Sequence, residues 1–178
     1  MSANIGKLSS LISPVPDPRL SKFGGLSLAA RVLPNCTWLP LRESPAHLPQ
    51  AYGQLAPSAG RDMQIGSEII TYRSCNATEP FGLGGCVRGA YGTRPAAHPA
   101  NETVQFLTQV YGGFLPDPAT TLVDEIMGNL ARVYNEAGLD AVYFDGAEAQ
   151  IATLPPWDPI AQLHAAFWKH LQRDALVK

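Results

Sequence analysis

Two carboxylates follow one short apolar run near the end of the sequence, at a spacing that could support catalysis. Residues 139–149 read LDAVYFDGAEA, so Asp145 closes the run and Glu148 comes three residues later. If the run is a strand of a parallel sheet, Asp145 lies at its carboxyl end, where enzymes of that architecture place their active sites. The two groups could then act as general acid, general base or nucleophile. A plainer interpretation stays open, in which Asp145 caps a turn and Glu148 is solvated, because Asp-Gly is a common turn sequence.

An amphipathic helix is expected before this strand. Asp117 is a candidate N-cap, Pro118 suits the first helical position, and Gly138 is a typical left-handed stop. Between them, apolar residues recur every three or four positions and form one stripe: Leu122, Ile126, Leu130, Val133 and Ala137.

A strand, a second helix and a further strand are expected to complete this part of the chain. Residues 141–144, AVYF, lack polar alternation, which is typical of a strand covered on both faces. The second helix is expected to begin near Asp158 and Pro159, and residues 175–177 resemble the start of another strand. This order of helices and strands is typical of a parallel α/β sheet or a (β/α)8 barrel.

We expect the first hundred residues to form a β-rich region with many turns. The 178-residue chain contains 16 Pro and 16 Gly, and this content is typical of a fold rich in loops. Residues 1–60 hold repeated Pro and short apolar runs, so we expect an irregular Pro-rich region there. The alternation of apolar and polar residues within 61–104 predicts a β-hairpin or meander module there, and we expect the helix–strand segment in residues 105–178. The predicted fold class is therefore α+β, with a β-rich N-terminal module followed by a partial (β/α) barrel-like segment.

Composition narrows the classes of partner. The chain is 46% hydrophobic and 16% charged, with a net charge of −2, which is typical of a globular protein and offers no basic surface for nucleic acid or an anionic membrane. No run approaches the ~18 apolar residues of a membrane span, and the first residues lack the apolar region of a signal peptide. We therefore expect neither nucleic acid nor membrane as a partner, and the sequence leaves the compartment open.

Cysteine and asparagine positions raise two further possibilities. Cys75 and Cys86 flank the predicted hairpin and could form a disulfide, with two reduced thiols as the equally weighted alternative. N-glycosylation triplets begin at Asn35, Asn76 and Asn101; they matter only in a secreted eukaryotic protein, and such triplets often arise by chance. No Cys or His cluster has zinc spacing, so we expect neither a metal nor another cofactor.

Two stretches resemble secreted carbohydrate-active proteins. Residues 130–149, LARVYNEAGLDAVYFDGAEA, about a ninth of the chain, resemble the helix–strand unit of TIM-barrel proteins of the glycoside hydrolase type. Upstream, a second set of residues is similar to a β-rich element of large sugar-processing barrels and of phage tail proteins: Gly66, Glu68, Ile70, Arg88, Gly89, Gly92, Thr93 and His98.

This resemblance implies hydrolysis of a glycosidic bond, with Asp145 as a catalytic or substrate-binding carboxylate and Glu148 as its partner. Carbohydrate would be the ligand, with Tyr143 and Trp157 as substrate-binding residues and no cofactor. Tyr143 should point away from its neighbour Phe144, and Trp157 either stacks on a sugar or packs beneath its own loop.

The β-rich element and the length of the chain both limit the glycoside hydrolase interpretation. Arg88 and His98 are expected to form a hydrogen-bonding pair that closes the hairpin rather than a catalytic dyad. A (β/α)8 barrel takes about 200 residues or more, whereas residues 105–178 hold at most two βα units. We therefore expect a truncated fragment of a longer extracellular protein, with the missing remainder as a partner and with activity of this chain alone in doubt.

Two other interpretations stay open. The first is a non-catalytic carbohydrate-binding or structural protein that retains a barrel remnant. The second, a nucleotide-binding α/β domain, is weaker, because GLGG at residues 82–85 is not followed by a helical pattern and the chain has no phosphate-binding P-loop sequence.

Overall fold

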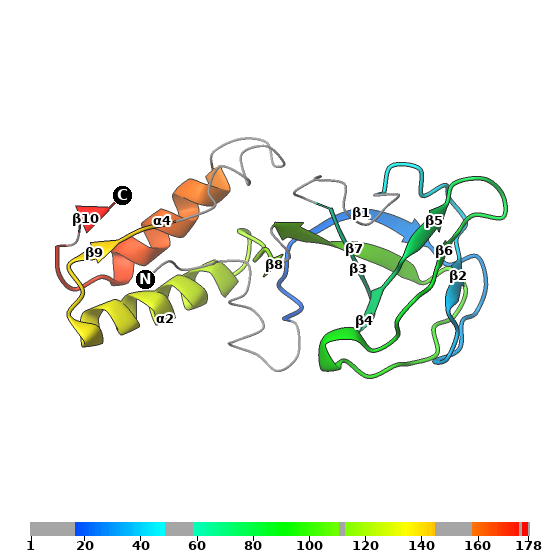
Figure 1. Cartoon of the computed structure of the whole chain (residues 1–178), viewed down its shortest axis with the longest axis horizontal. Coiled ribbons are helices and arrows are strands. Elements are labelled where there is room, and N and C mark those ends of the chain that lie inside the picture. Colours follow the sequence, from blue (N-terminus) through cyan, green and yellow to red (C-terminus); the bar gives the residue numbers. More distant parts are fainter. Residues whose placement is uncertain (1–16, 49–58, 111–112, 145–157, 175, 178) are drawn as a thin grey trace.

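The computed structural model describes residues 17–48, 59–110, 113–144, 158–174 and 176–177. The described chain has a β-rich half and a half built from two helices and a pair of short parallel strands (Figure 1). The predicted α+β class is confirmed, and no closed barrel is present among the described residues.

The larger sheet of the β-rich half is antiparallel and five-stranded. Its order is β1 (Lys22–Ser27), β7 (Thr103–Val110), β3 (Ala59–Ile65) and β4 (Glu68–Thr71), and β8 (Gly113–Phe114) also pairs with β7. A tight hairpin joins β3 to β4 and begins at Gly66, whose positive φ of 57° suits the turns that connect adjacent strands.

A second antiparallel sheet packs beside the first. It contains β2 (Trp38–Pro40), β6 (Gly82–Gly84) and β5 (Ser74–Asn76), in that order. A short 3-10 turn, η2 (Ala90–Gly92), follows β6. The strands of both sheets contribute to one apolar core, whose largest fully buried members include Leu39, Met63, Ile70, Tyr72, Leu83 and Phe106.

Strand pairing joins residues on both sides of positions 60 and 104, where the sequence placed boundaries. β1 pairs with β7 and β2 pairs with β6, so described strands from the supposedly separate residues 1–60 belong to the β-rich half. β7 itself crosses the boundary at residue 104 and pairs with β3. Local sequence patterns did not reveal this because these partners lie far apart along the chain.

The first helix, α2 (Leu122–Ala137), ends as predicted at Gly138, which adopts a φ of 63°. Its predicted start is wrong: Thr121 occupies the N-cap position, and Asp117 instead accepts a hydrogen bond from the backbone N–H of Ala119 (2.9 Å) in a separate turn. The predicted stripe is also partly wrong, because Val133 is 43% exposed. The residues that α2 buries are Leu122, Val123, Ile126, Met127, Ala131 and Tyr134.

The predicted strand, helix and strand that follow are confirmed. β9 (Ala141–Val142) and β10 (Leu176–Val177) pair in parallel, and α4 (Asp158–His170) connects them and packs against α2. Phe144 is 8% exposed and Tyr143 is 49% exposed, so the two side chains point to opposite sides of the strand, as expected. The expectation of a strand covered on both faces is wrong, because Ala141 and Tyr143 lie on an open face.

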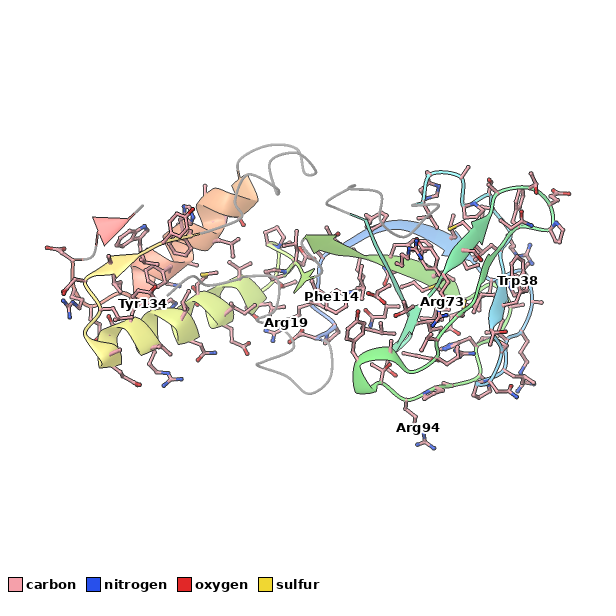
Figure 2. The ribbon with its side chains drawn as sticks, viewed as in Figure 1. Arg19, Trp38, Arg73, Arg94, Phe114 and Tyr134 are labelled. Atoms are coloured by element: carbon pink, nitrogen blue, oxygen red, sulfur yellow. The ribbon has the colours of Figure 1, made fainter. Side chains whose placement is uncertain are left out.

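The two halves share buried contacts at their junction. The apolar core around α2 and α4 extends to Ile69 of β4 and Leu107 of β7. At the surface of this junction, the Arg19 guanidinium donates hydrogen bonds to Thr121 Oγ1 (2.8 Å) and Glu125 Oε2 (2.9 Å) at the start of α2 (Figure 2).

Candidate functional site

The predicted catalytic pair follows the end of β9. Asp145, Glu148 and Trp157 all lie outside the described residues. Phe144 is the last described residue before them, and its ring packs edge-on against Phe167 of α4, with centroids 5.3 Å apart. This contact anchors the last described residue before Asp145 in the core around α4.

A histidine that the sequence did not single out lies beside this strand end. The imidazole of His164 packs on the ring of Phe144, with centroids 4.4 Å apart. Burial lowers the pKa of His164 below its ordinary value, so its imidazole is neutral at pH 7. A neutral imidazole can accept a proton at one ring nitrogen and donate a hydrogen bond from the other, which makes His164 a chemically competent neighbour of the strand end.

Tyr143 is the one predicted substrate-binding residue that the structure describes. Its side chain is about half exposed, on the side of the strand opposite to Phe144. An exposed tyrosine offers an apolar ring face together with a hydroxyl group, which suits contact with a sugar.

The strongest polar cluster among the described residues is centred on Glu68 of β4. Arg88 donates to both carboxylate oxygens, from Nε (2.8 Å) and Nη2 (2.7 Å). The backbone N–H groups of Gly89 and Ala96 donate as well, each at 3.0 Å, and His98 Nε2 lies 2.8 Å from Oε2. The Glu68 side chain is 0% exposed, so every one of these contacts is shielded from water.

These contacts keep the buried carboxylate ionised. Burial raises the pKa of Glu68, but hydrogen bonds from Arg88, Ala96, His98 and Gly89 together outweigh that effect and hold the pKa below its ordinary value. Since both oxygens already accept hydrogen bonds and solvent is excluded, Glu68 serves as a structural anchor rather than as a catalytic base.

Arg88 and His98 have the structural role expected of them, but they do not form a direct pair. Each contacts Glu68, which bridges them, and His98 Nδ1 also lies 3.1 Å from Glu102 Oε2. Arg88 further donates to the carbonyl oxygens of Leu33 and Ala96. From the sequence, Glu68 belongs to the resembling element but receives no role, although a lone acidic residue beside the apolar Ile69 and Ile70 was the available signal.

The cysteines are thiols rather than a disulfide in the structure. Cys75 lies opposite Leu83 in the β5–β6 pair, while the Cys86 thiol donates to the carbonyl oxygen of Leu83 (3.4 Å). Burial raises the pKa of Cys86 to about 12, which keeps that thiol protonated and unreactive at neutral pH.

The three triplet asparagines differ in accessibility. Asn35 and Asn101 are exposed. Asn76 is half-buried, and its Nδ2 donates to the carbonyl oxygen of Pro80 (2.9 Å), so the nitrogen that would carry a glycan is already engaged.

In the part of the chain that the structure describes, no group of three or more His, Cys, Asp or Glu side chains is placed to hold a metal ion. No described helix has the length and apolar character needed to cross a membrane.

Comparison with known protein families and curated proteins identifies no relative of this chain. The sequence matches none of the protein-family models, and no curated protein is significantly similar to it.

Proposed function

We propose that the chain acts on carbohydrate as a glycoside hydrolase-like protein, with Asp145 and Glu148 as its catalytic carboxylates. The observation that carries this proposal is the parallel pairing of β9 with β10 through α4. In parallel βα architectures, ligands bind at the carboxyl ends of the strands. Asp145 follows β9 by three residues and directly succeeds the buried Phe144.

Two carboxyl groups are sufficient for this reaction. Asp145, ionised, attacks or stabilises the anomeric carbon as the glycosidic C–O bond breaks, and Glu148, protonated, donates its proton to the leaving oxygen. Water then adds to the anomeric carbon and gives a proton to the Glu148 carboxylate, which releases Asp145 as a free carboxylate and restores both groups. The exposed ring of Tyr143, together with Trp157, would contact the sugar.

The direct test is to assay the chain on a panel of aryl glycosides beside Asp145→Asn and Glu148→Gln. General acid–base groups contribute ~100-fold or more, so each substitution should lower kcat/KM by at least that factor. Glu136→Gln is a matched control, because this exposed carboxylate lies near the end of α2 and forms an ion pair with the equally exposed Arg132 on the same helix. Hydrolysis that survives Asp145→Asn unchanged would refute the proposed role.

A second candidate function is carbohydrate binding or a structural role without catalysis. It is favoured by the Glu68 cluster, in which the most deeply buried carboxylate among the described residues holds residues 88–98 against β4. On this alternative, sugars bind without being hydrolysed, and Asp145→Asn leaves both the binding and the absence of turnover unchanged.

A further inference from the structure

The indole ring of Trp38 lies on the outer face of the three-stranded sheet, over two glycines of β6. Strand pairing places Trp38 opposite Gly84 and Pro40 opposite Gly82. A Cβ added to Gly82 would lie 2.2 Å from Cζ2 of the indole, and a Cβ added to Gly84 would lie 3.5 Å from its Cε3 and Cζ3. These atoms belong to opposite edges of the six-membered ring, so the ring lies along β6 with one face toward the strand.

The two glycines account for the inner face of this ring. Gly82 and Gly84 are buried, although neither has a side chain to cover its own backbone. An aromatic ring from a neighbouring strand stabilises a sheet at such glycines, so the inner face of the indole has a structural role. The outer face has no such role, because Trp38 is 39% exposed and no other ring among the described residues packs against it.

Hydrogen-bonding groups lie beside the exposed ring. Ser74 of β5 pairs with Gly84 from the other side, and its Oγ lies 2.6 Å from the position of a Cβ added to Gly84. The Ser74 hydroxyl is therefore on the same face of the sheet as the indole. Within the part of the chain that the structure describes, neither this hydroxyl nor the indole N–H of Trp38 has a hydrogen-bond partner. Both groups are available to a ligand that rests on the ring.

This face of the sheet carries no charged residue. Alternation along the paired strands places six residues on it, and none of them has an ionisable side chain: Trp38, Pro40, Ser74, Asn76, Gly82 and Gly84. A nucleic acid needs basic side chains beside its phosphates, so this surface does not suit one. A neutral sugar does suit it, because the sugar ring presents C–H groups to an aromatic face and hydroxyl groups that donate and accept hydrogen bonds around its rim.

We propose that Trp38 and Ser74 form a platform for one neutral sugar ring of a glycan chain. The sugar ring stacks on the indole, and its hydroxyl groups bond to Ser74 Oγ and Trp38 Nε1. The choice of a sugar rests in part on the proposed carbohydrate function. Trp38 lies at the end of the β-rich half farthest from the helices (Figure 2), so the platform anchors a glycan away from β9 and does not require Asp145.

Calorimetric titration of the full chain with cellotetraose, xylotetraose and mannotetraose tests the platform. At least one of these neutral oligosaccharides should bind, and its affinity should not change with salt concentration, because no charged group takes part. Trp38→Ala should weaken that binding at least about tenfold, since stacking on an aromatic ring is lost. Trp168→Ala is the matched control: Trp168 is 38% exposed but lies on α4 and packs against Phe167, so its replacement should leave the affinity unchanged.

Two further variants separate binding from folding. Trp38→Tyr keeps an aromatic ring over the glycines and should retain most of the affinity, whereas Ser74→Ala should weaken binding by removing one hydrogen bond. Circular dichroism of each variant confirms that it is folded. Failure of every oligosaccharide to bind, or binding that Trp38→Ala leaves unchanged, would overturn the proposal. Binding of adenosine through Trp38 in place of the oligosaccharides would overturn the choice of a sugar.

The same titrations in Asp145→Asn distinguish the platform from the proposed catalytic function. Retained oligosaccharide binding in this variant, together with loss of the hydrolysis seen in the wild type, supports both proposals. Binding through Trp38 in a wild-type chain that hydrolyses no glycoside supports the platform and refutes only the catalytic role. Hydrolysis without any binding that depends on Trp38 refutes only the platform.

Discussion

At the scale of single residues, Glu68 shows how a buried carboxylate in a strand can hold one long connection of the chain in place. Its four partners, Arg88, the backbone N–H groups of Gly89 and Ala96, and His98, all come from residues 88–98. Buried charges are tolerated only when paired and hydrogen-bonded, and here both conditions are met. Removing one member therefore leaves the others buried without compensation.

Replacement of Glu68 by Gln should consequently destabilise the protein. The Arg88 side chain is 6% exposed and would lose its counter-charge, so we expect a loss of about 3–5 kcal/mol in the free energy of unfolding. Urea denaturation followed by circular dichroism measures this loss. The exposed control Glu136→Gln should change stability by less than about 0.5 kcal/mol, and an equally small effect at Glu68 would contradict the anchoring role.

The same carboxylate predicts acid sensitivity. The pKa of Glu68 is lower in the folded protein than its ordinary value of 4.5, so the unfolded state binds more protons as the pH falls. Its stabilising contribution is complete above pH 4.5 and is lost as the pH drops through the folded-state pKa. Denaturation midpoints between pH 6 and pH 3 should fall less steeply in Glu68→Gln than in the wild type; parallel curves would show that other groups control the acid response.

Residue-level prediction from sequence succeeded only where local chemistry was sufficient. The opposite orientations of Tyr143 and Phe144 followed from strand alternation. The bridge through Glu68 did not, because it depends on chain segments that the fold brings together. Asp145, Glu148 and Trp157 stay predictions, since they lie outside the described residues.

At the scale of elements, the sequence marks the ends of helices more clearly than the partners of strands. For α2 it predicted the end correctly and the start wrongly. Gly138 was correctly expected to stop α2 because it can adopt a left-handed conformation. Asp117 was mistaken for the N-cap because an aspartate before a proline suits a turn as well as a helix start, and here it forms the turn. β-strand partners were not predictable in the same way, since β1 and β7 are separated by most of the β-rich half.

Gly138→Ala should test the cap directly. An alanine at a φ of +63° is strained, so we expect a loss of about 1 kcal/mol in the free energy of unfolding. The contact that a Cβ would make is with the far end of the Arg173 side chain, which can move, so the loss reports backbone strain. Gly25→Ala is the control: no atom lies within 4 Å of its added Cβ, and thermal unfolding should show almost no shift there.

At the scale of the whole molecule, the two halves are joined by buried apolar contacts. Ile69 and Leu107 of the larger sheet belong to the same core as Met127 and Phe167 of the helices. Because this core crosses the junction, loss of packing in the helical half removes support from the sheet. The described structure should therefore unfold as one cooperative unit.

Phe167→Ala tests this coupling. Phe167 is 0% exposed and contacts Tyr134 and Phe144, so its truncation should lower the free energy of unfolding by about 3–5 kcal/mol. Trp38 reports on the β-rich half and Trp168 on the helical half, and variants that keep only one tryptophan separate the two signals. Coincident fluorescence transitions, both shifted by Phe167→Ala, are expected, whereas a shift of the Trp168 signal alone would show that the halves unfold independently.

The Glu68 cluster also constrains how this sequence can change over evolutionary time. A single substitution at Glu68, Arg88 or His98 leaves a buried polar group without its partner. Replacement of all three residues by apolar ones at once need not leave such a group. Descendants of a common ancestor should therefore retain these three positions together or exchange them together. Such linked inheritance would mark the β-rich half in diverged homologues even where the rest of its sequence has become unrecognisable.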